Sequence, residues 1–80
     1  MNRYTYKFTS ICPVNEKKIS YKLVIETTQT IKVEDIMDFI EDNHKQSFHE
    51  VIADDLIDCF PGKHYLIAEH HGVLIETWRK

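Results

Sequence analysis

Two short segments carry the side chains from which a reactive site could be built. Cys12 lies in the segment Phe8–Pro13, between an alternating stretch and a proline, and Phe48 is followed by His49 and Glu50. A thiolate attacks electrophilic carbon, an imidazole moves protons, and a carboxylate accepts two N–H hydrogen bonds from the edge of a heterocycle. These residue types predict a cysteine nucleophile beside a clamp for a guanine-like ligand.

Each of these residues also has a purely structural interpretation. A free cysteine is often a small buried apolar residue. Ser47 and Glu50 have the spacing of a capping box, with Ser47 at the N-cap and Glu50 at position N3 of a helix. Cys59 falls on an apolar helical stripe, which predicts a core position. With only two cysteines in a short chain, reduced thiols are expected rather than a disulfide.

The histidines raise the question of a zinc site. They are His44, His49, His64, His70 and His71. Their spacing relative to each other and to the cysteines matches no strong zinc signature, so we expect solvated histidines in turns and no metal. The acidic residues of the chain's middle, among them Glu34 to Asp42, indicate a solvated helix face.

Length and charge restrict the class of protein. A chain of 80 residues with a formal net charge of −3 predicts one domain, residues 1–80. It contains no basic run, which argues against nucleic acid as a partner. No apolar stretch is long enough for a bilayer and no targeting motif is visible, which predicts a soluble cytoplasmic protein. Small size and open strand edges predict a homo-oligomer.

Hydrophobic periodicity predicts six elements. Alternation indicates strands, a period of 3.6 indicates helices, and His71-Gly72 is typical of a hairpin turn. The expected strands are Arg3–Ile11, Lys18–Thr27, His64–Glu69 and Val73–Trp78, and the expected helices are Val33–Asp42 and Ser47–Cys59. The residues of Lys18–Thr27 expected to face inward are Ile19, Tyr21, Leu23 and Ile25. The apolar helical stripes are Val33, Ile36, Met37 and Ile40 in the first helix and Phe48, Ile52, Leu56 and Cys59 in the second. This order predicts an α+β fold in which a four-stranded antiparallel sheet carries both helices on one face.

Several of these segments together resemble one enzyme family. They are Phe-Thr-Ser-Ile-Cys-Pro at residues 8–13, Ile-Ser-Tyr at 19–21, Asn43-His44 closely followed by Phe-His-Glu at 48–50, Asp-Leu-Ile at 55–57, Pro61, and Gly-Val-Leu-Ile at 72–75. They are similar to the 7-cyano-7-deazaguanine reductases, the nitrile reductases of queuosine biosynthesis, which are tunnelling-fold (T-fold) enzymes. The resemblance covers nearly the whole chain in order and implies a single compact T-fold domain.

The resemblance assigns roles to the two segments. It implies that Cys12 attacks a nitrile carbon to form a covalent thioimide. It implies that Glu50, with His49 beside it, holds the deazaguanine edge. It also implies NADPH as reductant and homo-oligomers with sites between subunits.

The chain departs from the family in two places. The loop after Cys12, which carries the family's acidic general acid, is shortened to Val14–Lys18, where Glu16 is the candidate replacement. The family's NADPH motif is not recognisable in Glu26–Asp35. Two other functions therefore remain open. One is an archaeosine-type amidinotransferase, which needs no NADPH, and the other is a non-catalytic module that binds a purine or pterin.

Overall fold

The computed structural model describes all 80 residues. The strands and helices follow the order ββααββ: β1 (Asn2–Ile11), β2 (Lys18–Thr27), α1 (Val33–Asn43), α2 (His49–Cys59), β3 (Lys63–His70) and β4 (Val73–Arg79). Every expected element is present, and no boundary differs from its prediction by more than two residues. The periodicity of the sequence was therefore sufficient to identify the elements.

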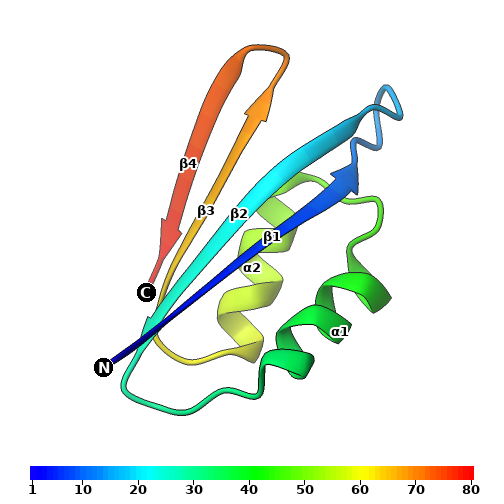
Figure 1. The fold of residues 1–80 in the computed structure, drawn as a ribbon. Helices are drawn as coiled ribbons and strands as arrows, with labels where there is room; N and C mark the ends of the chain where they lie inside the picture. Colours follow the sequence, from blue (N-terminus) through cyan, green and yellow to red (C-terminus); the bar gives the residue numbers. More distant parts are fainter.

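The four strands form one antiparallel sheet in the order β1-β2-β3-β4. The central pair, β2 and β3, is separated in the chain by both helices, and its register places Leu23 opposite Leu66. Both helices lie on the same face of this sheet (Figure 1). The predicted α+β class is confirmed, and the arrangement is that of a T-fold.

The core lies between the helices and the sheet. From β2, alternate residues point toward the helices and are at most 4% exposed: Ile19, Tyr21, Leu23 and Ile25. The other buried apolar residues of the helices and of β3 are Ile36, Ile40, Ile52, Ala53, Leu56, Leu66 and Ala68. Complete burial of one large aliphatic side chain stabilises the fold by roughly 1.5–3 kcal/mol. The alternation of β2 thus fixes which face of the sheet receives the helices.

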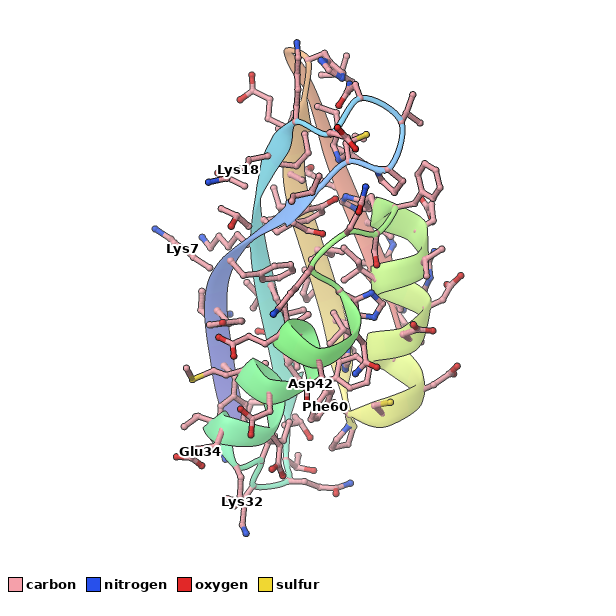
Figure 2. All side chains as sticks on the ribbon, turned by 90° about the vertical axis from the view of Figure 1, so that its right-hand side faces the viewer. Lys7, Lys18, Lys32, Glu34, Asp42 and Phe60 are labelled. Atoms are coloured by element: carbon pink, nitrogen blue, oxygen red, sulfur yellow. The ribbon has the colours of Figure 1, made fainter.

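The opposite face of the sheet has no covering layer. Lys7 and Lys18 project from it, away from the helices (Figure 2). Arg3 and Glu26, partners across β1 and β2, form an ion pair of 2.6 Å on this face. Polar and charged residues at these positions keep one face of an antiparallel sheet in water.

The predicted helical stripes are only partly buried. In α1, Ile36 and Ile40 enter the core, whereas Val33 and Met37 are exposed. Val33 and Met37 lie about 60° around the helix from the buried pair, since successive residues are separated by about 100°. In α2, Phe48 was expected on the buried stripe but is exposed. It precedes the helix in extended backbone, so its side chain does not follow the helical stripe.

Two glycines occupy backbone that disfavours other residues. His71 and Gly72 form the predicted turn between β3 and β4, with φ of 50° and 83°. Gly62 has φ of 105° and lies against the backbone of Glu26, so that a Cβ atom there would overlap the Glu26 carbonyl oxygen. By contrast, a Cβ atom on Gly72 would meet open space.

We predict different costs for the two alanine substitutions. Gly72→Ala should lower the free energy of unfolding by about 1–2 kcal/mol, the cost of a left-handed backbone for an L-residue. Gly62→Ala carries that cost plus about 1–3 kcal/mol for overpacking against Glu26. Urea unfolding measures both variants under the same conditions. Equal losses would contradict the close approach of Gly62 to β2.

Candidate functional site

Cys12 lies in the turn that joins β1 to β2. Its backbone N–H donates to the carbonyl of Lys17 at 2.9 Å, and its carbonyl accepts from the N–H of Glu16 at 2.9 Å. The side chain is half-buried, packs against the core and forms no disulfide. Pro13 follows and has no N–H to extend the ladder, which is why β1 ends here. The thiol is therefore held in a fixed position at one end of the sheet.

The end of β1 is attached to the segment that leads into α2. The Ser10 hydroxyl donates to the carbonyl of His44 at 2.7 Å, and the N–H of Ile11 donates to the carbonyl of Lys45 at 2.8 Å. Ile11 and Gln46 form an isolated parallel bridge. In Figure 1 this connection and the start of α2 lie at the same end of the molecule as the tip of β1. The fold thus brings the strand that ends at Cys12 to the segment that carries His49 and Glu50.

His49 is buried rather than presented to solvent. It is 5% exposed, and its Nε2 lies 2.9 Å from the Thr77 hydroxyl oxygen on β4. Its ring lies 5.6 Å from the ring of Tyr21 and 5.9 Å from that of His70. Burial lowers the pKa of His49 despite the nearby Glu50 carboxylate, which opposes the shift. The neutral imidazole therefore prevails at neutral pH, with one ring nitrogen as donor and the other as acceptor.

Tyr21 and His70 belong to the same cluster, although neither was expected in the site. Tyr21 was expected only as an inward-facing strand residue, and His70 as a solvated histidine. The Tyr21 hydroxyl, His49 Nδ1 and His70 Nε2 are all buried without a hydrogen-bond partner. A signal was present in β2, where the polar tip of Tyr21 lies on the inward face between Ile19 and Leu23.

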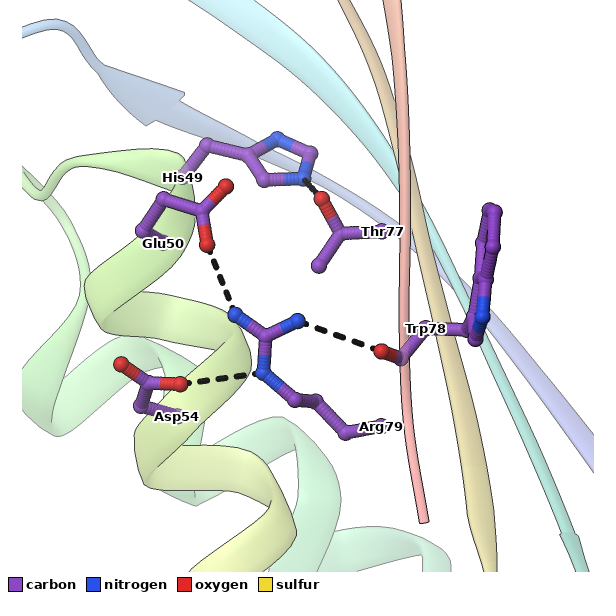
Figure 3. A network of polar contacts seen from close by, with 6 residues as sticks. All are labelled: His49, Glu50, Asp54, Thr77, Trp78 and Arg79. Carbon is purple, nitrogen blue, oxygen red and sulfur yellow. Dashed lines mark hydrogen bonds and ion pairs between the residues drawn. The ribbon is translucent and has the colours of Figure 1, made fainter.

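Glu50 is exposed and already paired. One of its carboxylate oxygens lies 2.7 Å from an Arg79 guanidinium nitrogen, and the Asp54 carboxylate lies 3.1 Å from another (Figure 3). The hydrogen bonds that Arg79 donates to these two carboxylates raise its pKa, and the bond to Asp54 has the larger effect. Since Asp54 also binds Arg79, the guanidinium keeps one partner when Glu50 bonds elsewhere.

The predicted capping box is wrong. The helix begins at His49, its N-cap is Phe48 in extended backbone, and no side chain caps it. The hydroxyl oxygen of Ser47 lies 2.9 Å from His44 Nδ1 instead. His44 thus engages the Ser47 hydroxyl that a capping box requires, and Glu50 has no capping role.

The two remaining candidates lie in exposed positions. Glu16 is in the β1–β2 turn with φ of 59°, its side chain exposed and without a hydrogen-bond partner. Cys59, predicted in the core, is exposed at the end of α2. The buried stripe of α2 contains Ile52 and Leu56. Cys59, the last residue of the helix, lies beyond the part of α2 that contacts the sheet.

The expectation of solvated histidines is wrong for most of them. His44, His49 and His64 are buried, His70 is half-buried and only His71 is exposed. Each buried histidine has a protein group in place of water at one of its ring nitrogens. His64 Nε2, for example, lies 3.0 Å from the Phe60 carbonyl oxygen. No three histidine, cysteine, aspartate or glutamate side chains come together as a metal site would require. None of the helices is long and apolar enough to cross a membrane.

Comparisons with known proteins add no relative. No protein-family model, no curated protein and no solved structure matches this chain. The resemblance to nitrile reductases therefore stays a prediction.

The buried histidines predict that stability falls in mild acid. Burial lowers the pKa of His44, His49 and His64. Below the unfolded value of about 6.5, the unfolded chain binds protons that the folded chain does not, so the free energy of unfolding decreases as pH falls. Urea unfolding between about pH 7.5 and 5.5 should show this decrease. His64→Gln should reduce it, whereas His71→Gln, at an exposed position, should leave it unchanged. An identical pH dependence in both variants would exclude His64 as a contributor.

Proposed function

We propose that this chain binds a 7-deazaguanine nitrile and adds it covalently to Cys12, the first step of nitrile reduction in queuosine biosynthesis. In this proposal the Cys12 thiolate attacks the nitrile carbon and Glu50 accepts N–H bonds from the guanine-like edge. The observation that carries it is the attachment of β1 to the segment before α2, through Ser10 and Ile11. That attachment supports a common site for thiol, imidazole and carboxylate, residues far apart in sequence.

Glu50 suits a clamp because of its position and its partner. It is in the first turn of α2 and its carboxylate is exposed, so a ligand can approach it. A carboxylate that meets two adjacent N–H groups makes a strong paired interaction. Arg79 can remain with Asp54 when Glu50 turns to the ligand.

We further propose that the working form is a homo-oligomer. Several apolar side chains next to the candidate residues are exposed: Phe48 precedes His49, Val51 follows Glu50, and Val73 is the strand partner of His70. Exposed apolar groups around a site favour coverage by a second chain. The outer strand β4 also has one unpaired edge, and the outer edge of β1 is paired only at Ile11.

The residues between β2 and α1 do not fit NADPH. The N–H of Gln29 donates to the Thr27 hydroxyl at 3.1 Å, and the N–H of Ile31 donates to the Tyr4 hydroxyl at 3.0 Å. These donors are thus not free for phosphate oxygens, and Lys32 is the sole cation of residues 28–32. We therefore derive no hydride-transfer step. This observation favours, as a second candidate, an archaeosine-type amidinotransferase, in which ammonia rather than hydride attacks the thioimide.

The covalent step has a direct test by mass spectrometry. Incubation with 7-cyano-7-deazaguanine should increase the intact mass of the wild type by the mass of one ligand. Cys12→Ala should show no increase, whereas Cys59→Ala, which removes an exposed thiol outside the site, should behave as wild type. Binding without a mass increase would leave a non-catalytic purine or pterin module as the function. The absence of both binding and adduct would refute the proposal.

The clamp has a matched pair of variants, because Glu50 and Asp54 both pair with Arg79. Glu50→Gln should weaken binding of the deazaguanine nitrile by about 2 kcal/mol or more, since an N–H donor replaces one of the two acceptors. Asp54→Asn should bind nearly as wild type. Calorimetric titration in the Cys12→Ala background separates binding from covalent addition. Equal effects of the two variants would show that the ion pairs with Arg79, not a ligand contact, cause the loss.

A further inference from the structure

A group of stacked rings extends from the Cys12 end of the sheet into the core. The Tyr21 ring lies 5.1 Å from that of Phe8 and 5.6 Å from that of His49. The His70 ring makes edge contacts with both, 6.0 Å from Tyr21 and 5.9 Å from His49. Cys12 packs against the same core, and its negative charge as a thiolate contributes to the raised pKa of Tyr21. We call Tyr21, His49 and His70 the ring cluster.

The ring cluster contains three polar atoms that the fold does not use. The Tyr21 hydroxyl, His49 Nδ1 and His70 Nε2 are buried and have no hydrogen-bond partner. Tyr21 is 2% exposed and His49 is 5% exposed. Buried polar atoms are almost always paired, and an unpaired one destabilises the protein. A phenylalanine at position 21 would fill the same space without that cost, so packing alone does not account for the hydroxyl.

The protonation states suit the transfer of protons. Burial, and then the Cys12 charge, raise the pKa of Tyr21 to about 12, so its hydroxyl carries a proton at neutral pH. Burial lowers the pKa of His49, which leaves a neutral imidazole with one acceptor nitrogen. The cluster therefore places a proton donor and a proton acceptor in the core against which Cys12 packs.

We propose that the ring cluster is the proton-transfer apparatus of Cys12, with Tyr21 as the donor to the nitrogen that forms when Cys12 adds to a nitrile. This inference rests on the proposed function, because it assigns the general acid of that same site. It gives Tyr21 the role for which the resemblance to nitrile reductases suggests Glu16. Glu16 has an exposed side chain in a turn, whereas the Tyr21 hydroxyl is in the core that Cys12 contacts.

The step is balanced without any further reactant. The thiol proton passes to an imidazole of the cluster, the sulfur–carbon bond forms, and one π bond of the nitrile breaks. The nitrile nitrogen takes a proton from the Tyr21 hydroxyl, and the phenolate recovers a proton from the imidazolium. The net result is addition of S–H across the C≡N bond, with no oxidation or reduction.

Two reagents distinguish proton donation from simple activation of the thiol. A heteroaryl nitrile, 2-cyanopyrimidine, needs a proton on its nitrogen as sulfur adds, whereas iodoacetamide releases iodide and needs none. The full chain with Cys59→Ser leaves Cys12 as its single thiol, and intact mass gives the rate of each reaction. The chain with Cys12→Ser retains exposed Cys59 and supplies the rate of a thiol without the cluster.

Tyr21→Phe should slow addition of the nitrile by about 100-fold, the scale of general acid catalysis, with alkylation by iodoacetamide about unchanged. Tyr6→Phe is the matched control. Tyr6 lies on the same face of β1 as Phe8 and stacks on it. Its ring does not stack on a histidine of the ring cluster. Tyr21→Phe should unfold at the same urea concentration as wild type or a higher one, because the lost hydroxyl has no partner.

Three results would overturn the inference: nitrile addition at Cys12 no faster than at Cys59, no effect of Tyr21→Phe, or equal slowing of both reactions. If Tyr21→Phe does not fold, His70→Gln at a half-buried position replaces it, and an unchanged nitrile rate is then decisive. The small nitrile has no guanine-like edge, so the result does not depend on Glu50. Failure of the ring cluster is thus distinguishable from failure of deazaguanine binding.

Discussion

The pairing of β2 with β3 is the interaction on which the rest of the structure depends. The two strands lie on either side of both helices in the chain, yet they form the centre of the sheet. Closing so long a connection costs chain entropy that grows only slowly with its length. Burial of Leu23 against Leu66, and of the helix residues above them, offsets that cost. Once β2 and β3 pair, their inward residues determine the face on which α1 and α2 must lie.

The candidate site depends on a second, smaller attachment. Ser10 and Ile11 bind the backbone of His44 and Lys45, so the start of α2 is held to the end of β1. Backbone carbonyls in this connection need donors, and Ser10 and Ile11 at the end of β1 supply two. The same hydrogen bonds that satisfy this connection also bring Cys12 and the His49 segment to one end of the molecule. The hydrogen bonds that give these backbone carbonyls their donors therefore also position the candidate residues.

The ring cluster shows a conflict between stability and chemistry. Its three unpaired polar atoms lie in a small core that has little stability to spare. By contrast, the exposed pairs of Arg79 with Glu50 and Asp54 satisfy their own charges in contact with water. Outside the ring cluster, His64 Nδ1 is also buried without a partner, whereas His44 Nε2 lies 3.1 Å from the Asp55 carboxylate. Unsatisfied groups of this kind concentrate where a protein acts on another molecule.

The amino-acid sequence by itself determined the six elements and the face of β2 that is buried, because periodicity depends only on local geometry. It also identified Cys12, His49 and Glu50 as residues whose side chains could react with or bind a ligand. The tertiary structure decided what surrounds each of them. Ser47 bonded to His44 rather than capping α2, Cys59 was left exposed, and Glu50 met Arg79 from the far end of the chain. Tyr21 and His70 joined His49 only through strand pairing and helix packing. Contacts between residues distant in sequence depend on the register of the sheet and the competition for partners, and no local pattern contains that information.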